Sequence, residues 1–325
     1  MPTTRSNPSP RVSVIIPSYN TADLIAACLD SVLAQTYTDF EAIVVNDGSP
    51  DTPDLEKVLE PYRHAIVYIK QENKRAAGAR NNAIRQARGE FVAFLDSDDS
   101  WTPGHLSAQM QLFAEDPSLD LVYSNALLVG DPAREQEFME KCPSHGPATF
   151  AALIMEHCQI PISTVVARKH TLVEAGLFDE RLPRCDDYDM WVRSAFCGAR
   201  IKYSRKVQAR LFIGRPGSLG QSRSKMAEAY WRILEKTGQT LPLQESDRDL
   251  VRKRAEQIKV RYLVEEGKSK LSEGQFDKAA ELFSEANKNS RQPKLSLALL
   301  GLKVAPAATH KLFSCWMRLR SDSAV

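Results

Sequence analysis

The sequence predicts an α/β fold, in which a mostly parallel sheet is flanked by helices and followed by an all-α C-terminal region. Two observations indicate it. Over the first ~125 residues, short apolar runs alternate with segments whose apolar residues recur at helical spacing, a pattern typical of parallel strands covered on both faces. From about residue 225 onward only the helical spacing remains, which predicts a separate helical region.

Apolar runs predict four strands, over residues 12–16, 41–45, 66–69 and 91–95. The amphipathic segments between them predict helices, the first of them capped by Thr21. Ligands of such sheets bind beyond the carboxyl ends of the strands. Polar clusters follow three of these strands, namely Tyr19 and Asn20, Asn46 and Asp47, and Asp96 to Asp99. We therefore expect a binding site at this edge of the sheet.

The second half of the chain is less regular. Residues 130–146 predict a long loop of the kind that often lines a binding site, and a strand is expected over 162–167. A helix is expected over 186–196, with Gly198 as its stop. The predicted organisation is a disordered N-terminus (1–10), an α/β domain (11–224) and a helical region (225–325), with helices over 225–236, 247–271, 276–289 and 294–304.

Composition narrows the classes of function. The 325 residues carry 43 Lys and Arg against 41 Asp and Glu, so the net charge of +2 creates no field for nucleic acid. The six cysteines show no C-x-x-C and no clustering with His, which disfavours a disulfide framework or a zinc site. Residues 1–10 lack the apolar core of a secretory signal, and no apolar run is long enough to cross a bilayer. A cytoplasmic protein is expected.

Two carboxylates, Asp96 and Asp98, directly follow the fourth predicted strand. Side chains at i and i+2 can point into one cleft where a strand ends, and two charges so close are commonly held by Mg²⁺ or Mn²⁺. Such a cation neutralises the charge on a departing nucleoside diphosphate. The alternative is an acidic turn that caps the next helix.

Two further segments offer ligand contacts. Asp47 lies in an Asn-Asp-Gly-Ser turn, where its carboxylate can accept the N–H of a nucleobase, although a plain Asp-Gly turn is the simpler alternative. Residues 73–84 open a helix with small residues, and Lys74 or Arg80 can reach a phosphate near its positive end. A solvated first turn is the alternative there.

Five motifs together resemble the family 2 glycosyltransferases, which have the Rossmann-like GT-A fold. They occupy residues 14–20, 31–36, 44–49, 79–81 and 89–99. The match is close over residues 11–115 and looser to about 222. Five motifs in the right order and spacing are far more specific than any one of them.

The resemblance implies a nucleotide-sugar donor, usually a UDP-sugar, and an acceptor in cell-surface polysaccharide or glycoconjugate synthesis. It implies a base pocket near Pro17, Tyr19 and Asp47, with Asn20 as a further donor contact. Many relatives carry two acids where this chain has Asn46 and Asp47. Asn46 can still hydrogen-bond a ribose or base, so donor binding is expected while the preference for uridine stays open.

The resemblance also assigns roles to three acids. It implies a metal held mainly by Asp98, with Asp96 against the ribose or a metal-bound water. Asp186 and Asp187 correspond to the acidic pair before an aromatic-containing helix, of which Asp187 is the general base. Inverting transfer needs a carboxylate to take the proton of the acceptor hydroxyl, opposite the leaving diphosphate. The alternative is that Asp186, Asp187 and Asp189 only cap the helix.

The C-terminal part adds two expectations. Residues 215–222 lie where relatives carry a loop that closes over the diphosphate, so Arg215 is a candidate phosphate contact. Residues 262–290 resemble one tetratricopeptide-type hairpin, and a single repeat cannot form a solenoid. Residues 295–320 either close the core of the tail or lie in a membrane interface, with Trp316 buried and Lys311, Arg318 and Arg320 at the headgroups.

The preferred prediction is a metal-dependent, inverting glycosyltransferase acting on a glycan or lipid-linked acceptor, with possible peripheral membrane contact at the inner face. A catalytically silent binding or scaffold module of the same fold is the alternative, and the presence of Asp96, Asp98 and Asp187 argues against it. A nucleotidyltransferase or dehydrogenase is disfavoured, because no G-x-G-x-x-G follows the first strand and no P-loop lysine motif occurs.

Overall fold

The computed structural model describes residues 9–130, 135–215, 222–290 and 292–312. The chain divides into two compact units between Arg215 and Pro216, ahead of the boundary near residue 224 that the sequence indicates. Three predicted features lie wholly or largely outside the described residues. They are the disordered N-terminus, residues 216–221 of the predicted diphosphate loop, and the tail residues Trp316, Arg318 and Arg320.

The described part of the first unit is built on a nine-stranded mixed sheet in the order β3-β2-β1-β4-β8-β6-β9-β5, with β7 paired to β6. The four predicted strands form its parallel half, as β1 (Val12–Ser18), β2 (Phe40–Asp47), β3 (Ile66–Gln71) and β4 (Phe91–Phe94). Ser18 is in register with Asn46, and Ile15 with Phe94. The polar residues that follow these strands therefore reach the same edge of the sheet.

The other half of the sheet is largely antiparallel. It comprises β5 (Ser100–Trp101), β6 (Leu121–Val129), β7 (Gln136–Glu137), β8 (Val166–Arg168) and β9 (Ile201–Phe212). Strand β8 runs antiparallel to both β4 and β6, while β9 is parallel to β6 and antiparallel to β5. The β9 strand is the longest of the sheet and was not among the predicted strands.

Two predicted segments differ from the structure. The strand expected over 162–167 begins instead as a 3₁₀ turn, η3 (Ile162–Thr164), because the carbonyl of Pro161 accepts both the N–H and the hydroxyl of Thr164. The loop expected over 130–146 includes, in its described residues, strand β7 and the short helix α5 (Phe138–Lys141).

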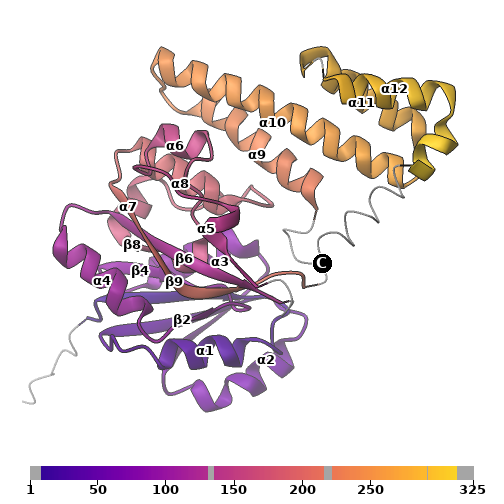
Figure 1. Ribbon diagram of the computed structural model, residues 1–325. Coiled ribbons are helices and arrows are strands. Elements are labelled where there is room, and N and C mark those ends of the chain that lie inside the picture. The colour runs from indigo at the N-terminus through magenta and orange to yellow at the C-terminus, as the bar shows by residue number, and fades with distance from the viewer. Residues whose placement is uncertain (1–8, 131–134, 216–221, 291, 313–325) are drawn as a thin grey trace, which may run out of the picture. The chain divides into compact units, whose positions relative to one another are not determined.

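Helices cover both faces of the sheet. Figure 1 shows α1 (Ile25–Leu33) and α2 (Thr52–Leu59) on one side of the strands, and α3 (Arg75–Gln86) and α8 (Asp186–Phe196) on the other. Helix α4 (His105–Glu115) contributes Leu106 and Phe113 to the core with α1 and α2. The remaining short helices are η1 (Glu60–Tyr62), α6 (Phe150–Ile154) and α7 (Lys169–Glu174).

The first helix begins later than its predicted cap. Helix α1 begins at Ile25, and no side chain caps it. The carbonyl of Thr21 accepts the N–H groups of Leu24 and Ile25 in a preceding turn. The Thr21 hydroxyl is instead hydrogen-bonded to Ser18, the last residue of β1, and to Ser97, which follows the end of β4.

The second unit is helical throughout its described residues. It comprises α9 (Arg223–Thr240), α10 (Glu245–Ser272), α11 (Phe276–Ser290) and α12 (Pro293–Val304), followed by helical residues 306–312. Helices α10 and α11 pack closely, because a Cβ at Gly267 would lie 2.5 Å from the Phe283 ring. None of the described helices combines the length and the apolar character needed to cross a bilayer.

Candidate active site

The turn that carries Asp96 and Asp98 is fastened to the end of β1. Its middle residue, Ser97, is buried, and the Ser97 hydroxyl lies 2.9 Å from that of Thr21. Thr21 in turn hydrogen-bonds Ser18 at 3.0 Å. This chain of hydroxyls fixes the turn through Ser97 and leaves Asp96 and Asp98, its two neighbours, partly exposed.

Asp98 is the second carboxylate of this turn, and the charges of Arg215 and Arg80 act on it without forming an ion pair. It makes no hydrogen bond or ion pair with any other residue that the structure describes. Burial, and then the negative charge of Asp96, raise the pKa of Asp98 to about 6. A divalent cation would relieve this repulsion. No cluster of three or more His, Cys, Asp or Glu occurs in the described residues, yet Mg²⁺ commonly binds one or two carboxylates together with phosphates and water. The pair fits such a cation.

Asp47 offers an acceptor at the neighbouring strand end. Its Oδ1 accepts hydrogen bonds from Gln71 Nε2 at 2.7 Å and from the N–H of Lys74 at 2.8 Å. Its Oδ2 is buried and has no partner among the described residues. Burial raises the pKa of Asp47 above its ordinary value, and these hydrogen bonds oppose the rise. A buried acceptor without a donor is costly, which indicates a place for a ligand N–H.

The turn around Asp47 requires glycine at its next position. Gly48 has φ +64°, and a Cβ there would lie 2.7 Å from the backbone nitrogen of Asn73. The β2–α2 turn and the segment before α3 therefore touch backbone to backbone. This close approach lets the N–H of Lys74 reach the Asp47 carboxylate.

Asn46 holds the same turn from inside. Its side chain is fully buried, and its Nδ2 donates to Thr52 Oγ1 at 2.9 Å and to the Tyr68 hydroxyl at 2.8 Å. Its Oδ1 accepts the N–H of Ser49 at 2.9 Å. Both N–H groups are therefore engaged within the protein. The structure thus places Asn46 behind the turn, in contrast with the ribose or base contact expected from the sequence.

Arg80 lies between two carboxylates that are distant in sequence. Its side chain is 5% exposed, and it binds Asp96 and Asp186, each at 2.7 Å. Burial lowers the pKa of the guanidinium, but the charges of Asp96 and Asp186 outweigh this and raise it above its ordinary value. The sequence predicted a phosphate contact near a helix start. The structure instead engages both terminal nitrogens of Arg80 with protein carboxylates.

Asn81, the next residue of α3, fixes the segment that leads to α8. Its Nδ2 donates to the carbonyl of Phe178 at 2.8 Å and to Glu180 at 2.9 Å, and its Oδ1 accepts the N–H of Phe178 at 2.9 Å. Asn81 was not among the residues predicted to act at the site. Adjacent residues of α3 thus hold both Asp186 and the chain that precedes it.

Helix α8 presents Asp186 and Asp187 at its first turn. The residue before them, Cys185, has φ +55° and makes no side-chain cap hydrogen bond. Asp186, Asp187 and Asp189 all lie in the first turn, where negative charge favours a helix, so the simpler interpretation holds beside the catalytic one. The N–H of Tyr188 donates to Asp187 Oδ1 at 2.8 Å. Burial, and then the charge of Asp186, raise the pKa of Asp187 to about 6, while Arg80 opposes the rise.

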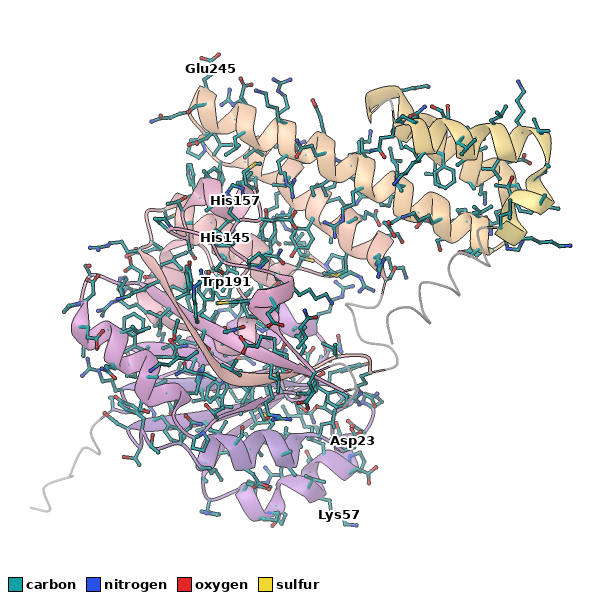
Figure 2. The ribbon with its side chains drawn as sticks, in the orientation of Figure 1. Asp23, Lys57, His145, His157, Trp191 and Glu245 are labelled. Carbon is teal, nitrogen blue, oxygen red and sulfur yellow. The ribbon has the colours of Figure 1, made fainter. Side chains whose placement is uncertain are left out.

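Trp191 anchors this helix to the sheet. Trp191 is labelled in Figure 2. Its side chain is 1% exposed, and its ring centroid lies 6.2 Å from that of Phe94 and 6.1 Å from that of Phe178. Phe94 is the last residue of β4, two residues before Asp96. Aromatic packing and the Arg80 ion pairs therefore set α8 against the strand that carries the Asp96–Asp98 turn.

The residues expected at the end of β1 lie beside Arg215. The Arg215 guanidinium donates to the carbonyl of Asn20 and lies 3.3 Å from Asp23, which Figure 2 labels. Asn20 has φ +55°, and its N–H donates to Ser49 Oγ at 2.6 Å. Tyr19 is 52% exposed, and Pro17 is half-buried. The structure thus groups Tyr19, Asn20 and Arg215 at one edge.

Comparison with known proteins gives the family. Residues 13–150 match the sequence profile of Glycosyl transferase family 2. The Escherichia coli protein WfaP, a UDP-Glc:alpha-D-GlcNAc-diphosphoundecaprenol beta-1,3-glucosyltransferase, is 34% identical over 200 residues, which are 60% of this chain and 74% of WfaP. The chain belongs to glycosyltransferase family 2. The amylovoran biosynthesis glycosyltransferase AmsB of Erwinia amylovora is 29% identical over 86% of this chain and 92% of its own length.

Other relatives match over a smaller share of their length. The chain spans 31% to 58% of the length of uncharacterized glycosyltransferases from Rickettsia felis and Rickettsia typhi, at 30% and 32% identity. Among solved structures, Staphylococcus aureus TarS matches with a TM-score of 0.60 at 20% identity, over 95% of this chain and 91% of that one. The mannosyltransferase PcManGT of Pyrobaculum calidifontis matches with a TM-score of 0.62 at 21% identity, over 96% and 84%. These likenesses show the GT-A fold with its helical C-terminal region.

Proposed function

We propose that the chain transfers a sugar from a UDP-sugar to a hydroxyl of a glycan carried on a lipid diphosphate, with inversion, in cell-surface polysaccharide or glycoconjugate synthesis. The observation that carries the proposal is the double ion pair of Arg80. It joins Asp96, beside the unpaired Asp98, to Asp186, beside the base candidate Asp187. The activity of WfaP, from UDP-glucose to a diphosphoundecaprenol-linked sugar, supports this choice of donor and acceptor.

The residues proposed to bind the UDP-sugar donor lie at and beyond the carboxyl ends of β1 and β2. In this proposal the free Oδ2 of Asp47 accepts the ring N–H of uracil, and Tyr19 and Pro17 form the wall of the base pocket. Asn20 borders the pocket, and Asn46 shapes it from behind. Arg215 exchanges its contacts with Asn20 and Asp23 for the donor diphosphate.

A divalent cation, Mn²⁺ or Mg²⁺, supplies positive charge to the leaving diphosphate when bound. Asp98 is its main protein ligand in this proposal, because Asp98 has no partner among the described residues. Asp96 is shared with Arg80 and contributes either a second ligand or a contact to the donor ribose. The structure of PcManGT with GDP-Man and Mn²⁺ supports a cation in this fold.

Asp187 removes the proton of the acceptor. As the acceptor oxygen bonds to the anomeric carbon, Asp187 takes the hydroxyl proton, and the bond from that carbon to the diphosphate oxygen breaks, with its electron pair leaving on UDP. A base whose pKa lies near the working pH is the most effective, and a pKa of about 6 suits Asp187. Asp186, bound to Arg80, orients the first turn of α8.

Release of UDP from a panel of UDP-sugars, with and without Mn²⁺ and with a lipid-diphosphate acceptor, tests the proposal. We expect release by the wild type with Mn²⁺, and at least about a hundredfold less by Asp98→Asn and by Asp187→Asn, as for loss of a catalytic acid–base group. Asp54→Asn, a change in the first turn of α2, is the control and should match the wild type. A wild type that binds no nucleotide sugar with metal present would exclude the transferase function.

The helical unit supports a second part of the proposal, peripheral contact with the cytoplasmic face of the membrane. Three apolar side chains of α12, Leu297, Leu300 and Val304, are 71%, 58% and 74% exposed. Their spacing places them on one side of the helix. Exposed lysines at positions 294, 303 and 311 flank them, so the surface is complementary to anionic lipid headgroups.

Sedimentation of the full chain with phosphatidylglycerol-containing liposomes tests the membrane contact. The wild type should sediment with the vesicles, and the variant with serine at residues 297, 300 and 304 should not. Val173→Ser, which replaces an apolar side chain of the first unit that is 52% exposed, is the matched control. Equal sedimentation of the triple variant and the wild type would contradict the assignment.

A further inference from the structure

Asp99, the residue after the Asp96–Asp98 turn, accepts two hydrogen bonds from opposite directions. Its Oδ1 accepts the N–H of Phe212 at 2.8 Å, and its Oδ2 accepts the hydroxyl of Ser163 at 2.5 Å. Phe212 is the last residue of β9, and Ser163 lies in η3. One carboxylate therefore connects three segments that are far apart in the sequence.

The Ser163 contact connects Asp99 to the Asp96–Asp98 turn. Ser163 Oγ accepts the N–H of Asp96 at 3.1 Å while its own hydrogen is donated to Asp99. The carbonyl of Ser163 accepts the indole N–H of Trp101 at 2.6 Å, which holds η3 against β5. The backbone of Asp96 is thus fixed by a hydroxyl whose orientation Asp99 determines.

The Phe212 contact connects Asp99 to the segment that carries Arg215. Phe212 precedes the segment 213–215, and Arg215 binds the carbonyl of Asn20 and the side chain of Asp23. The N–H of Ile213 donates to the carbonyl of Val129 at 2.7 Å, so the chain stays hydrogen-bonded to β6 for one residue past the Asp99 contact. Asp99 therefore fixes the last point of β9 before Arg215.

We propose that Asp99 is a positioning residue, which sets the Asp96–Asp98 turn and the Arg215 segment at a fixed spacing so that both meet one donor diphosphate. This inference rests on the proposed function and deepens it. Asp99 touches no substrate in this account. It acts through Ser163 on one side and through Phe212 on the other.

The two contacts match the two acceptor oxygens of a carboxylate. Both partners of Asp99 are donors, an O–H and an N–H, and an ionised carboxylate accepts with both oxygens. An amide of the same shape has one oxygen and one NH₂ group, so Asp99→Asn must lose one of the two contacts or turn Ser163 away from its donor role. Asp99→Asn therefore keeps the shape of the side chain and disturbs only its hydrogen bonds to Ser163 and Phe212.

Glu41 provides a matched control at the opposite edge of the sheet. It is a buried carboxylate whose Oε1 accepts the hydroxyl of Ser13 at 2.7 Å and the N–H of Arg88 at 2.8 Å, the same two kinds of donor. Its Oε2 also forms an ion pair with the Arg88 guanidinium at 2.8 Å. Glu41→Gln should therefore cost at least as much stability as Asp99→Asn. Glu41→Gln should leave the affinity for UDP unchanged, because Glu41 has no contact with the Asp96–Asp98 turn or with Arg215.

The experiment compares wild type, Asp99→Asn, Ser163→Ala and Glu41→Gln by calorimetric titration of UDP in the presence of Mn²⁺, and by transfer kinetics. We expect the Kd for UDP and the donor KM to rise at least tenfold for Asp99→Asn and for Ser163→Ala, with the acceptor KM unchanged. The Asp99→Asn/Ser163→Ala double variant should bind UDP as well as the single variant that has the lower UDP affinity. The two residues act through the same series of hydrogen bonds, so their effects should not add.

Two results would overturn the inference. One is wild-type UDP affinity in both Asp99→Asn and Ser163→Ala. The other is an equal loss of UDP affinity in Glu41→Gln, which would show a general effect of losing a buried carboxylate. If Asp99→Asn does not fold, Ser163→Ala alone decides, because it removes only one hydroxyl. Failure of the wild type to bind UDP would reject the donor assignment instead, and the two failures are thereby distinguishable.

Discussion

The guanidinium of Arg80 lies 2.7 Å from the carboxylate of Asp186, a residue 106 positions later in the chain. Its other terminal nitrogen lies 2.7 Å from Asp96. One buried cation therefore holds the turn beside the proposed metal ligand and the helix that carries the proposed base. Because a lone buried charge is costly, each of the three residues depends on the other two.

Arg80→Lys should destabilise the protein, because an ammonium on a single stem cannot bind two carboxylates in the fixed fork of a guanidinium. We expect a loss of about 2–3 kcal/mol in the free energy of unfolding by denaturant, less than the full value for a broken buried pair because Asp96 is partly exposed. Arg252→Lys, in an exposed ion pair with Asp249, should cost under ~0.5 kcal/mol. Equal stability of Arg80→Lys and wild type would contradict the bridge.

Periodicity predicted the parallel half of the sheet because β1, β2 and β4 are buried on both faces, and because the edge strand β3 still carries a short apolar run. Helix α8 was predicted with its observed bounds, since apolar spacing and Gly198 define it. Strand β9 was missed because Lys202, Arg205, Lys206 and Arg210 interrupt its apolar residues, and most of the strand is partly or fully exposed. Its place in the sheet comes from pairing with β6 and β5, which local sequence does not encode.

The site was predicted in its parts and not in its connections. Motif order placed Asp47, Asp98 and Asp187 at strand and helix ends, where the structure also has them. No local pattern indicates that Arg80 meets Asp186 or that Ser163 meets Asp99, because these contacts join segments about 60 to 110 residues apart. Such contacts form only when the strands and helices that carry these residues are brought side by side in the folded protein.

Asp47→Asn should weaken nucleotide binding. The change replaces a buried acceptor, Oδ2, by an amide that cannot serve Gln71, Lys74 and a base N–H together. Loss of one such contact predicts about a tenfold rise in the Kd for UDP, or roughly 1.4 kcal/mol. Calorimetric titration measures it, with Asp39→Asn at the far end of β2 as the control. Unchanged UDP affinity would remove Asp47 from the base pocket.

Gly48→Ala should be far more damaging than Gly146→Ala. The two glycines have nearly equal φ values, +64° and +68°, but only Gly48 has a backbone atom within 2.7 Å of a new Cβ, whereas Gly146 has open space. The left-handed conformation alone costs about 1 kcal/mol, and the clash should add about 2 kcal/mol or more. Thermal or denaturant unfolding of the two variants separates these costs. Equal losses would mean that the close approach at Asn73 is unimportant.

The activity should fall in acid as Asp187 is protonated. Its pKa of about 6 in the folded protein lies above the value of about 4 for an unfolded Asp, so kcat/KM should decline as the pH drops through 6. The same shift makes the folded state bind the proton more tightly, so ionised Asp187 destabilises the fold, and this penalty disappears as the pH falls from 6 to 4. In the proposed site, saturating Mn²⁺ would keep Asp98 ionised during the assay. An acid limb near pH 4 would contradict the assignment.

The most direct test of the division between donor and base residues is calorimetric titration of UDP, with Mn²⁺ present, into the wild type, Asp98→Asn and Asp187→Asn. The account predicts that Asp187→Asn binds UDP as tightly as the wild type while its transfer is lost, and that Asp98→Asn loses at least tenfold in affinity. Loss of UDP binding in Asp187→Asn, or wild-type affinity in Asp98→Asn, would contradict it.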